Sequence, residues 1–407
     1  MLRKKGRLFL AHTEMGYSIS TRCSRKLIIF FAIIFLLLPA ASFAEDEKEE
    51  KPQIRTVQTP TAIRDYSFRA SADLLLPYID YNPADGFITG LYLYGSDYLG
   101  SHQVEAIGGY GFKSGRAHIQ AGYTYMRFWP AFGINLFQRY TYIENSNNTL
   151  GEDEEWFRER GGNFLVSFPL SKNLRIDAIY TLKEVTDEFR EYPGAPFIKY
   201  QQGAIGGSLV WDNVVYQEIG PISGIQFNIH GDFGEKKLGS DFYYRNYEGE
   251  IRGYANYNFN QHWKYGKRLV AATRLMAGYK ENDVLVFPLG GQDSLRGYGY
   301  HEFHGTRIAL ANLELRYPLF EINQVIMPMD LFLAKRLDFA VFGDAGRVWN
   351  KGQKAKFEDA EASVGAGLRF LMFIYGKIPL YHNIEVSKSV TDAERGTRGF
   401  FSFGTMF

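Results

Sequence analysis

Apolar and polar side chains alternate with a period of two along most of this 407-residue chain, from about Ser67 to Phe407. In one stretch, Leu174, Ile176, Ala178, Tyr180 and Leu182 interleave with Arg175, Asp177, Thr181 and Lys183. This alternation is typical of β-strands that have one apolar and one hydrated face. After residue 44, no apolar run approaches the roughly 20 residues of a membrane-spanning helix. The pattern therefore predicts an all-β fold.

The composition favours a membrane barrel over a soluble sandwich, whose strands also alternate but turn their apolar faces inward. Aromatic residues make up 16% of the chain, with 28 Tyr and 33 Phe, and aromatic girdles are typical of barrels at both membrane interfaces. We predict a transmembrane antiparallel β-barrel of about sixteen strands over residues 67–407. The strands are expected near 68–79, 86–95, 102–112, 115–128, 131–143, 156–168, 173–184, 199–212, 222–234, 242–259, 266–280, 304–318, 337–348, 361–372, 379–389 and 397–407.

Residues 1–44 have the features of a secretory signal peptide. A basic stretch ending at Lys26 precedes the 12-residue apolar run Leu27–Leu38, and Ser42-Phe43-Ala44 supplies small residues for cleavage after Ala44. The run is too short to span a bilayer as a helix. The long basic region leaves both Met1 and Met15 open as the start. We expect export through this signal to the bacterial outer membrane.

The remaining composition excludes several function classes. Residues 45–66 form a charged leader, expected in the periplasm and too short for a folded module. The single cysteine, Cys23, lies in the signal, so we expect neither disulfides nor thiolate metal sites. A net charge of +1 gives no case for nucleic-acid binding. No nucleophile–base pair or metal motif is visible, so we predict no enzymatic activity, no metal and no cofactor.

The segment Gly290–Tyr298 interrupts the alternation between the eleventh and twelfth predicted strands. An even strand number places both barrel ends in the periplasm, so this segment belongs to the sixth extracellular loop, which is long enough to fold back inside. Its Arg296 and the later strand residue Asp344 suggest an ion pair across the barrel interior. A guanidinium suits this role because it stays charged and presents a planar fork of donors.

Strand parity supplies further partners for the loop. Ala309, Ala311, Leu313 and Leu315 form one face of the twelfth strand, and Asn312, Glu314 and Arg316 form the other. On the thirteenth strand, Phe339, Val341 and Ala345 face away from Asp344. Both Glu314 and Asp344 are therefore predicted to point into the lumen, within reach of Arg296. The ion pairs could pin the loop and stiffen the barrel, or couple loop position to barrel opening.

The chain ends on alternating aromatics. Phe401, Phe403 and Phe407 share one face of the last predicted strand, and Phe407 is the final residue. This arrangement resembles the C-terminal signal by which outer-membrane barrels are recognised for insertion. The alternative is an ordinary final strand.

These motifs resemble those of the BamA/TamA outer-membrane assembly superfamily, also called the bacterial surface antigen proteins. The loop motif comprises Gly291, Leu295, Arg296, Gly297 and Tyr298, and the strand motif comprises Phe342, Asp344, Gly346 and Trp349. Glu314 stands where the family has an acidic residue. Trp211, Asp212, Asn213, Pro221 and Gly224 resemble its mid-barrel turn.

The resemblance implies a part in outer-membrane biogenesis, by insertion or translocation of proteins through a seam between the first and last strands. The implied partners are outer-membrane lipids, unfolded outer-membrane protein clients and a separate periplasmic partner. The last follows because characterised members carry periplasmic POTRA modules, which we expect this chain to lack. A gated or passive transport barrel, or a surface antigen without assembly activity, remains the alternative.

Overall fold

The computed structural model describes residues 70–144, 154–189, 199–217, 220–259, 268–282, 286–325, 332–374, 378–392 and 394–403. The chain divides into two units, Met1–Tyr66 and Ser67–Phe407, and the described residues all belong to the second. The predicted signal peptide (1–44) and charged leader (45–66) thus lie outside the described residues. Within the described ranges, no helix is long and apolar enough to cross a membrane.

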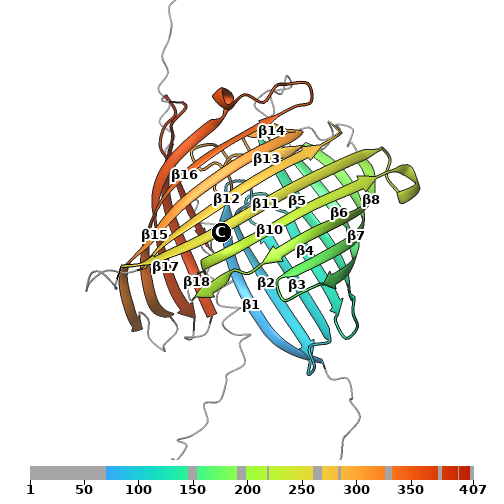
Figure 1. Cartoon of the computed structure of the whole chain (residues 1–407), viewed down its shortest axis with the longest axis horizontal. Coiled ribbons are helices and arrows are strands. Elements are labelled where there is room, and N and C mark those ends of the chain that lie inside the picture. The colour runs from blue at the N-terminus through green and yellow to red at the C-terminus, as the bar shows by residue number, and fades with distance from the viewer. Residues whose placement is uncertain are drawn as a thin grey trace, which may run out of the picture. The chain divides into compact units, whose positions relative to one another are not determined.

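Sixteen strands form the barrel, and each pairs antiparallel with the next (Figure 1). They are β1 (Ala70–Asn82), β2 (Gly86–Asp97), β3 (His102–Gly111), β4 (Ala117–Tyr125), β5 (Ala131–Glu144), β6 (Glu154–Pro169), β7 (Leu174–Phe189), β8 (Lys199–Asp212), β10 (Gly220–Gly234), β11 (Tyr244–Asn258), β12 (Arg268–Lys280), β15 (Arg307–Val325), β16 (Phe332–Trp349), β17 (Glu361–Ile374), β18 (Ile378–Ser389) and β19 (Arg398–Phe403). The predicted barrel and its strand number are confirmed.

Three short strands and two 3-10 helices complete the described structure. Strand β9 (Val215–Gln217) pairs with the start of β10, and β13 (Phe287–Leu289) pairs with β14 (Phe303–Gly305). The helices are η1 (Lys236–Leu238) and η4 (Phe357–Asp359). The β13–β14 hairpin lies within the segment 281–306, between the eleventh and twelfth barrel strands, β12 and β15. We call this segment the sixth loop.

The barrel turns its apolar side chains outward and its polar side chains inward. On the outer face, large apolar side chains are exposed, among them Leu91, Ile119, Leu136, Ile176, Ile205, Ile229, Leu275, Leu313 and Ile384. Buried polar residues come from the alternate positions, among them Asp177, Gln202, Asn312, Asn383 and Ser387. This is the reverse of a soluble sandwich, so the period-two pattern encodes a lipid-facing wall around a polar lumen.

Several strands extend beyond their predicted bounds, and the longest extension is that of the twelfth strand. The predicted twelfth strand ends at Pro318, a residue without the backbone N–H that a central strand donates. In the structure β15 continues to Val325, with register shifts between Pro318 and Phe320 and between Glu321 and Gln324. These irregularities accommodate Pro318, which has no backbone N–H to donate, and β16 pairs along the whole extension.

The first and last strands form the seam of the barrel. Strands β1 and β19 lie next to each other, and over their described residues, 70–82 and 398–403, no ladder of paired residues joins them. Strand β1 pairs with β2 from Ala70 to Asn82, whereas the described part of β19 pairs with β18 only from Arg398 to Phe403. Over the described residues the barrel is therefore nearly closed, with the six residues of β19, Arg398–Phe403, on one side of the seam.

Candidate functional site

The sixth loop builds its own small core against the lumen wall. Buried apolar residues of the loop and of β15 pack together: Phe287, Leu289, Leu295, Tyr298, Ile308 and Leu310. Leu295 has no exposed surface. On β16, a Cβ atom at Gly346 would lie 3.2 Å from Leu310 and 3.3 Å from Leu289. The absence of a side chain at Gly346 thus gives the loop room to pack against the wall.

Arg296 lies in this loop with a fully buried side chain. Its Nε and Nη2 donate to the two carboxylate oxygens of Asp344 at 2.8 and 2.7 Å, and its backbone N–H donates to the same carboxylate at 3.2 Å. Nη1 donates to Glu314 at 3.2 Å. The guanidinium carbon lies 3.3 Å from the centre of the Phe342 ring. One planar cation thus ties the loop to both β15 and β16.

The surroundings keep this guanidinium charged. Burial alone lowers the pKa of Arg296, but the hydrogen bonds and negative charge of Asp344, with Glu385 and Glu314, raise the pKa above its ordinary value. Arg296 is therefore a cation over the whole physiological pH range, so the contact is not broken by deprotonation of the arginine.

Three more charged residues surround this contact, and they come from β15, β17 and β18. Arg316 Nε and Arg369 Nη2 lie 2.7 and 2.5 Å from the same oxygen of Glu314. Glu385 Oε1 lies 3.6 Å from Nη1 of Arg296 and 3.6 Å from Nη2 of Arg369. We call this set the buried charge cluster: Arg296, Glu314, Arg316, Asp344, Arg369 and Glu385. Its three positive and three negative charges balance, which matters because an unpaired buried charge costs several kcal/mol.

Sequence reasoning missed Arg369 and Glu385 as members of the cluster. Both lie at inward positions of strands whose neighbouring residues face outward, such as Leu368 beside Arg369 and Ile384 beside Glu385. The same parity argument that placed Glu314 could therefore have found them. What the sequence could not supply is the tilt and register that bring four strands to one point.

Tyr298 anchors the loop at a second place on the same wall. Its hydroxyl lies 2.7 Å from Ser389 Oγ and 2.5 Å from Thr391 Oγ1, and it donates to Glu361 at 2.5 Å. The preceding Gly297 lies against this wall. A Cβ atom there would lie 2.5 Å from the Cβ of Ser363, closer than real side chains approach. Only glycine lets the loop sit this close.

Gly290 and Gly291 begin the turn that carries these anchors. Their φ angles are 120° and 92°, in the region that glycine favours. A Cβ atom at Gly290 would lie 2.3 Å from the carbonyl oxygen of Gly299. These glycines allow the tight reversal that aims the anchoring residues at the wall.

The loop also contacts the opposite side of the barrel. Nδ1 of His301 donates to the carbonyl oxygen of Tyr142 on β5 at 2.5 Å, and the Tyr300 and Tyr142 rings stack with centroids 6.2 Å apart. Burial lowers the pKa of His301 below the ordinary value of 6.5, more than its hydrogen bond to Tyr142 and nearby Asp293 raise it. The histidine is therefore neutral at pH 7, and the loop crosses the lumen between two walls.

The remaining motif residues that the structure describes lie on β16 and β19. Trp349 is half-buried at the end of β16, and its backbone leaves no space for a side chain at Gly305. Phe401 of the C-terminal pattern is 38% exposed on the outer face. Phe403 ends the described part of β19, and Phe407 lies outside the described residues. The insertion-signal role of these phenylalanines stays a prediction.

A family model described as the Omp85 superfamily domain matches residues 102–404. The structure of BamA from Haemophilus ducreyi lacking POTRA domains 1–3 superposes with a TM-score of 0.59 at 17% identity, over 83% of this chain and 70% of that one.

Two CdiB structures match with lower identity. CdiB from Escherichia coli gives a TM-score of 0.53 at 12% identity, over 84% of this chain and 63% of that one. CdiB from Acinetobacter baumannii gives a TM-score of 0.53 at 10% identity, over 83% of this chain and 65% of that one. The chain thus spans between 63% and 70% of these three proteins. No curated protein sequence matches it significantly.

A sixteen-stranded barrel with a lipid-facing wall and a loop tied inside its lumen defines an integral outer-membrane protein. The family match covers most of that barrel, and the chain belongs to the Omp85 superfamily. The predicted resemblance to BamA-type barrels is confirmed. At identities of 10–17%, the solved structures show a shared fold.

Proposed function

We propose that this protein takes part in outer-membrane biogenesis by inserting proteins into the outer membrane or translocating them across it. The observation that carries the proposal is the seam. Over the described residues β1 and β19 are not joined by a ladder, so strand edges with backbone donors and acceptors face each other. Such an edge is a template on which an unfolded client strand can pair.

In this proposal the sixth loop controls the opening of the seam. The buried charge cluster fastens it to β15, β16, β17 and β18, which are the four strands leading to β19. Ser387 on β18 also donates to the carbonyl oxygen of Arg296 at 2.6 Å. Movement of the loop therefore pulls on the wall next to the seam. We propose that loop position sets how readily this wall parts from β1.

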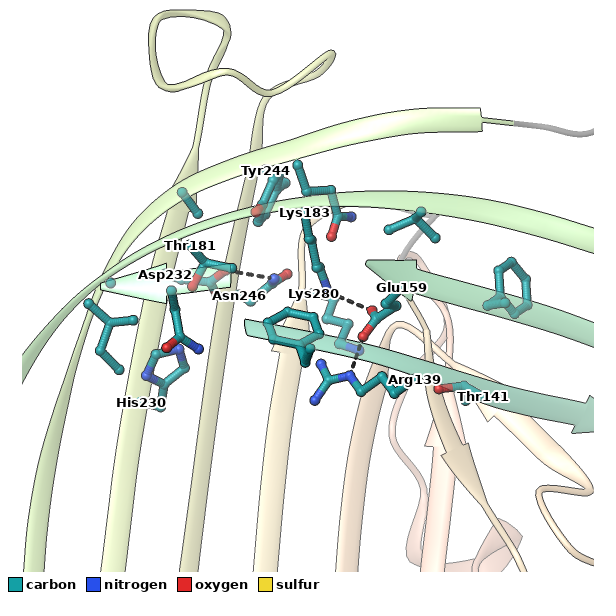
Figure 2. Close-up of a pocket in the computed structure, with 18 of the residues that line it drawn as sticks. Arg139, Thr141, Glu159, Thr181, Lys183, His230, Asp232, Tyr244, Asn246 and Lys280 are labelled. Atoms are coloured by element: carbon teal, nitrogen blue, oxygen red, sulfur yellow. Dashed lines mark hydrogen bonds and ion pairs between the residues drawn. The ribbon is translucent and has the colours of Figure 1, made fainter. Parts of the chain in front are cut away.

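The proposal includes export through cleavage after Ala44, clients that are unfolded outer-membrane proteins, a separate periplasmic partner and no enzymatic role. A gated or passive transport barrel is the second candidate. A cavity of about 540 Å³ between the sixth loop and the wall favours it, because this space could hold a small solute (Figure 2). Against it stands the sixth loop, which crosses the lumen from β18 to β5. The assembly function requires the seam to open, whereas transport through the lumen does not.

A locked seam tests the proposal. The predicted mature chain has no cysteine, so cysteine pairs scanned across Leu74–Leu76 of β1 and Gly399–Phe401 of β19 would form the only disulfides. The matched control is a pair at Leu93 and Ala106, which already face each other in the β2–β3 ladder. We expect oxidised seam pairs to abolish function reversibly and the control pair to leave it intact. Full activity of a locked barrel contradicts the proposal and favours transport through the lumen.

A further inference from the structure

The outer face of β5, β6, β7 and β8 changes from apolar to polar along one row of paired residues. The last apolar row joins residues that pair directly across these four strands: Leu136, Gly162, Leu182 and Gly203. Positions two apart on a strand share a face, so the next outward row is Gln138, Arg160, Glu184 and Gln201, and the row beyond it contains Arg158, Thr186 and Lys199. We call these two the outer polar rows.

The outer polar rows lie at the edge of the lipid-facing wall. Toward the middle of the barrel, the outward side chains of these strands are apolar and exposed: Ile134, Leu136, Phe164, Leu182 and Ile205. The seventh and eleventh barrel strands, β7 and β12, end on the same side of the barrel, which is predicted to be extracellular. Lipid head groups begin where the apolar band of a barrel ends. The outer polar rows are therefore level with the head groups of the outer leaflet.

These rows carry more positive than negative charge. Arg158, Arg160 and Lys199 stand against the single carboxylate of Glu184, which leaves two positive charges in excess. Lys199 Nζ lies 2.7 Å from Glu184, and the Lys199 side chain is still 59% exposed. Arg160 is also exposed. These cations are accessible from the membrane side of the wall.

Neutral side chains orient the two arginines. Nε and Nη2 of Arg160 donate to Oε1 of Gln138 at 3.1 and 2.7 Å. Nη2 of Arg158 donates to Oγ1 of Thr186 at 3.4 Å. A hydrogen bond to an amide or a hydroxyl holds a guanidinium in place without cancelling its charge. The inner face of the same strands differs, because there Arg139 and Lys183 both donate to Glu159 (Figure 2).

A surface turn borders the rows on the side of β8. The Tyr180 hydroxyl, on the outer face of β7, donates to the carbonyl oxygen of Leu238 in η1 at 3.1 Å. The same carbonyl occupies the space that a side chain at Gly203 would need. The charges of this turn balance, since it contains Glu235, Lys236, Lys237 and Asp241. The excess positive charge therefore comes from the strands.

The same end of the barrel is different on other strands. On β1, β2 and β3 the outward positions near this end carry aromatic rings: Tyr81, Phe87 and Tyr110. Outward arginines of β11, β15 and β16 each contact a ring or an acid: Arg245 over Tyr243, Arg307 over Tyr279 and Arg347 beside Asp359. The outer polar rows are thus a local feature of β6, β7 and β8.

We propose that the outer polar rows bind a lipid of the outer leaflet whose head group carries phosphates at two separate positions. Guanidinium groups present paired donors that match phosphate oxygens. Arg160 and Lys199 lie on strands two apart, about 10 Å at the usual strand spacing, so one phosphate cannot contact both. The apolar row at Leu136 and Leu182 lies next to these cations and suits the acyl chains of the same molecule. Free phosphate would make no use of that row.

The test is native mass spectrometry of the full-length protein in a zwitterionic detergent, titrated with lipid A. Its diphosphorylated form is compared with its monophosphorylated form and with phosphatidylglycerol. We expect the diphosphorylated form to bind most tightly. Arg160→Gln and Lys199→Gln should each weaken its binding about fivefold, the effect of one basic residue at an anionic membrane surface. Either variant alone suffices if the other does not fold.

Two matched controls keep the result specific. Arg307→Gln removes an outward cation at the same barrel end, and Arg139→Gln removes a cation from the inner face of the same wall. Both should bind lipid A like the wild type. The inference is overturned if phosphatidylglycerol or the monophosphorylated form binds as tightly, if neither Arg160→Gln nor Lys199→Gln weakens binding, or if the controls weaken it equally. These changes leave the seam and the sixth loop intact, so the result is independent of the proposed assembly function.

Discussion

Replacing Arg296 by alanine should release the sixth loop while leaving the barrel folded. The variant removes the side-chain hydrogen bonds to Glu314 and to both carboxylate oxygens of Asp344. Glu314 keeps Arg316 and Arg369 within 2.7 Å, so the carboxylate that loses its ion pair is Asp344. Asn312 and Ser363 still donate to it, at 2.8 and 3.3 Å, but neither carries a charge.

The free-energy cost to loop docking follows from the unpaired charge of Asp344. Breaking a buried ion pair by removing one partner typically costs about 3–5 kcal/mol, which shifts the balance between docked and released loop by roughly a hundredfold to several thousandfold. The backbone ladders of the sixteen strands do not involve this side chain. The cost should therefore fall on the loop rather than on unfolding of the barrel.

Two assays separate these effects. Protease cleavage within residues 281–306 on intact cells reports loop release, and heat-modifiable gel mobility reports barrel stability. We expect Arg296→Ala to be cut readily with unchanged heat modification, and Arg139→Ala, a lumen arginine outside the cluster, to resist cleavage like the wild type. Adding Asp344→Ala to Arg296→Ala should restore part of the protection, because it removes the unpaired charge. If heat modification and activity decline together, the cluster is only structural and the proposed coupling is wrong.

Three further changes test other parts of the loop. Gly297→Ala should displace the loop and increase its cleavage, because the new methyl group would overlap Ser363. Tyr298→Phe should weaken docking by about 1–2 kcal/mol by removing the hydrogen bond to Glu361, measured as cleavage rate. Since the docked pKa of His301 is depressed, the docked loop binds fewer protons than the released one. Docking should therefore be complete above pH 6.5, the ordinary value, and weaken as pH falls through the lower docked pKa. A His301→Gln variant should show no such pH dependence in the same cleavage assay.

The sequence predicted the barrel well because strand parity is a local property. Each residue's face follows from its neighbours, so Glu314 and Asp344 could be assigned to the lumen, where the structure places them. The position of the loop between the eleventh and twelfth strands followed from the same count. Short strands such as β9 and β13 carry too few residues to show a period and were not predicted.

Long-range contacts were harder to predict. The contact of His301 with Tyr142 joins residues 159 positions apart, and nothing in either local sequence indicates the other. The same holds for Glu385, which reaches Arg296 only because β18 is the third strand along from β15. Strand tilt and shear determine which side chains distant in the sequence come into contact, and strand parity alone fixes neither of them.

The central claim is that this barrel acts on other outer-membrane proteins and that its sixth loop controls the action. Quantitative outer-membrane proteomics after depletion of the protein, with wild-type and Arg296→Ala copies supplied in parallel, tests it most directly. The account predicts selective loss of other barrels or surface proteins on depletion, full recovery with the wild type and poor recovery with the folded variant. An unchanged outer-membrane proteome after depletion would contradict it.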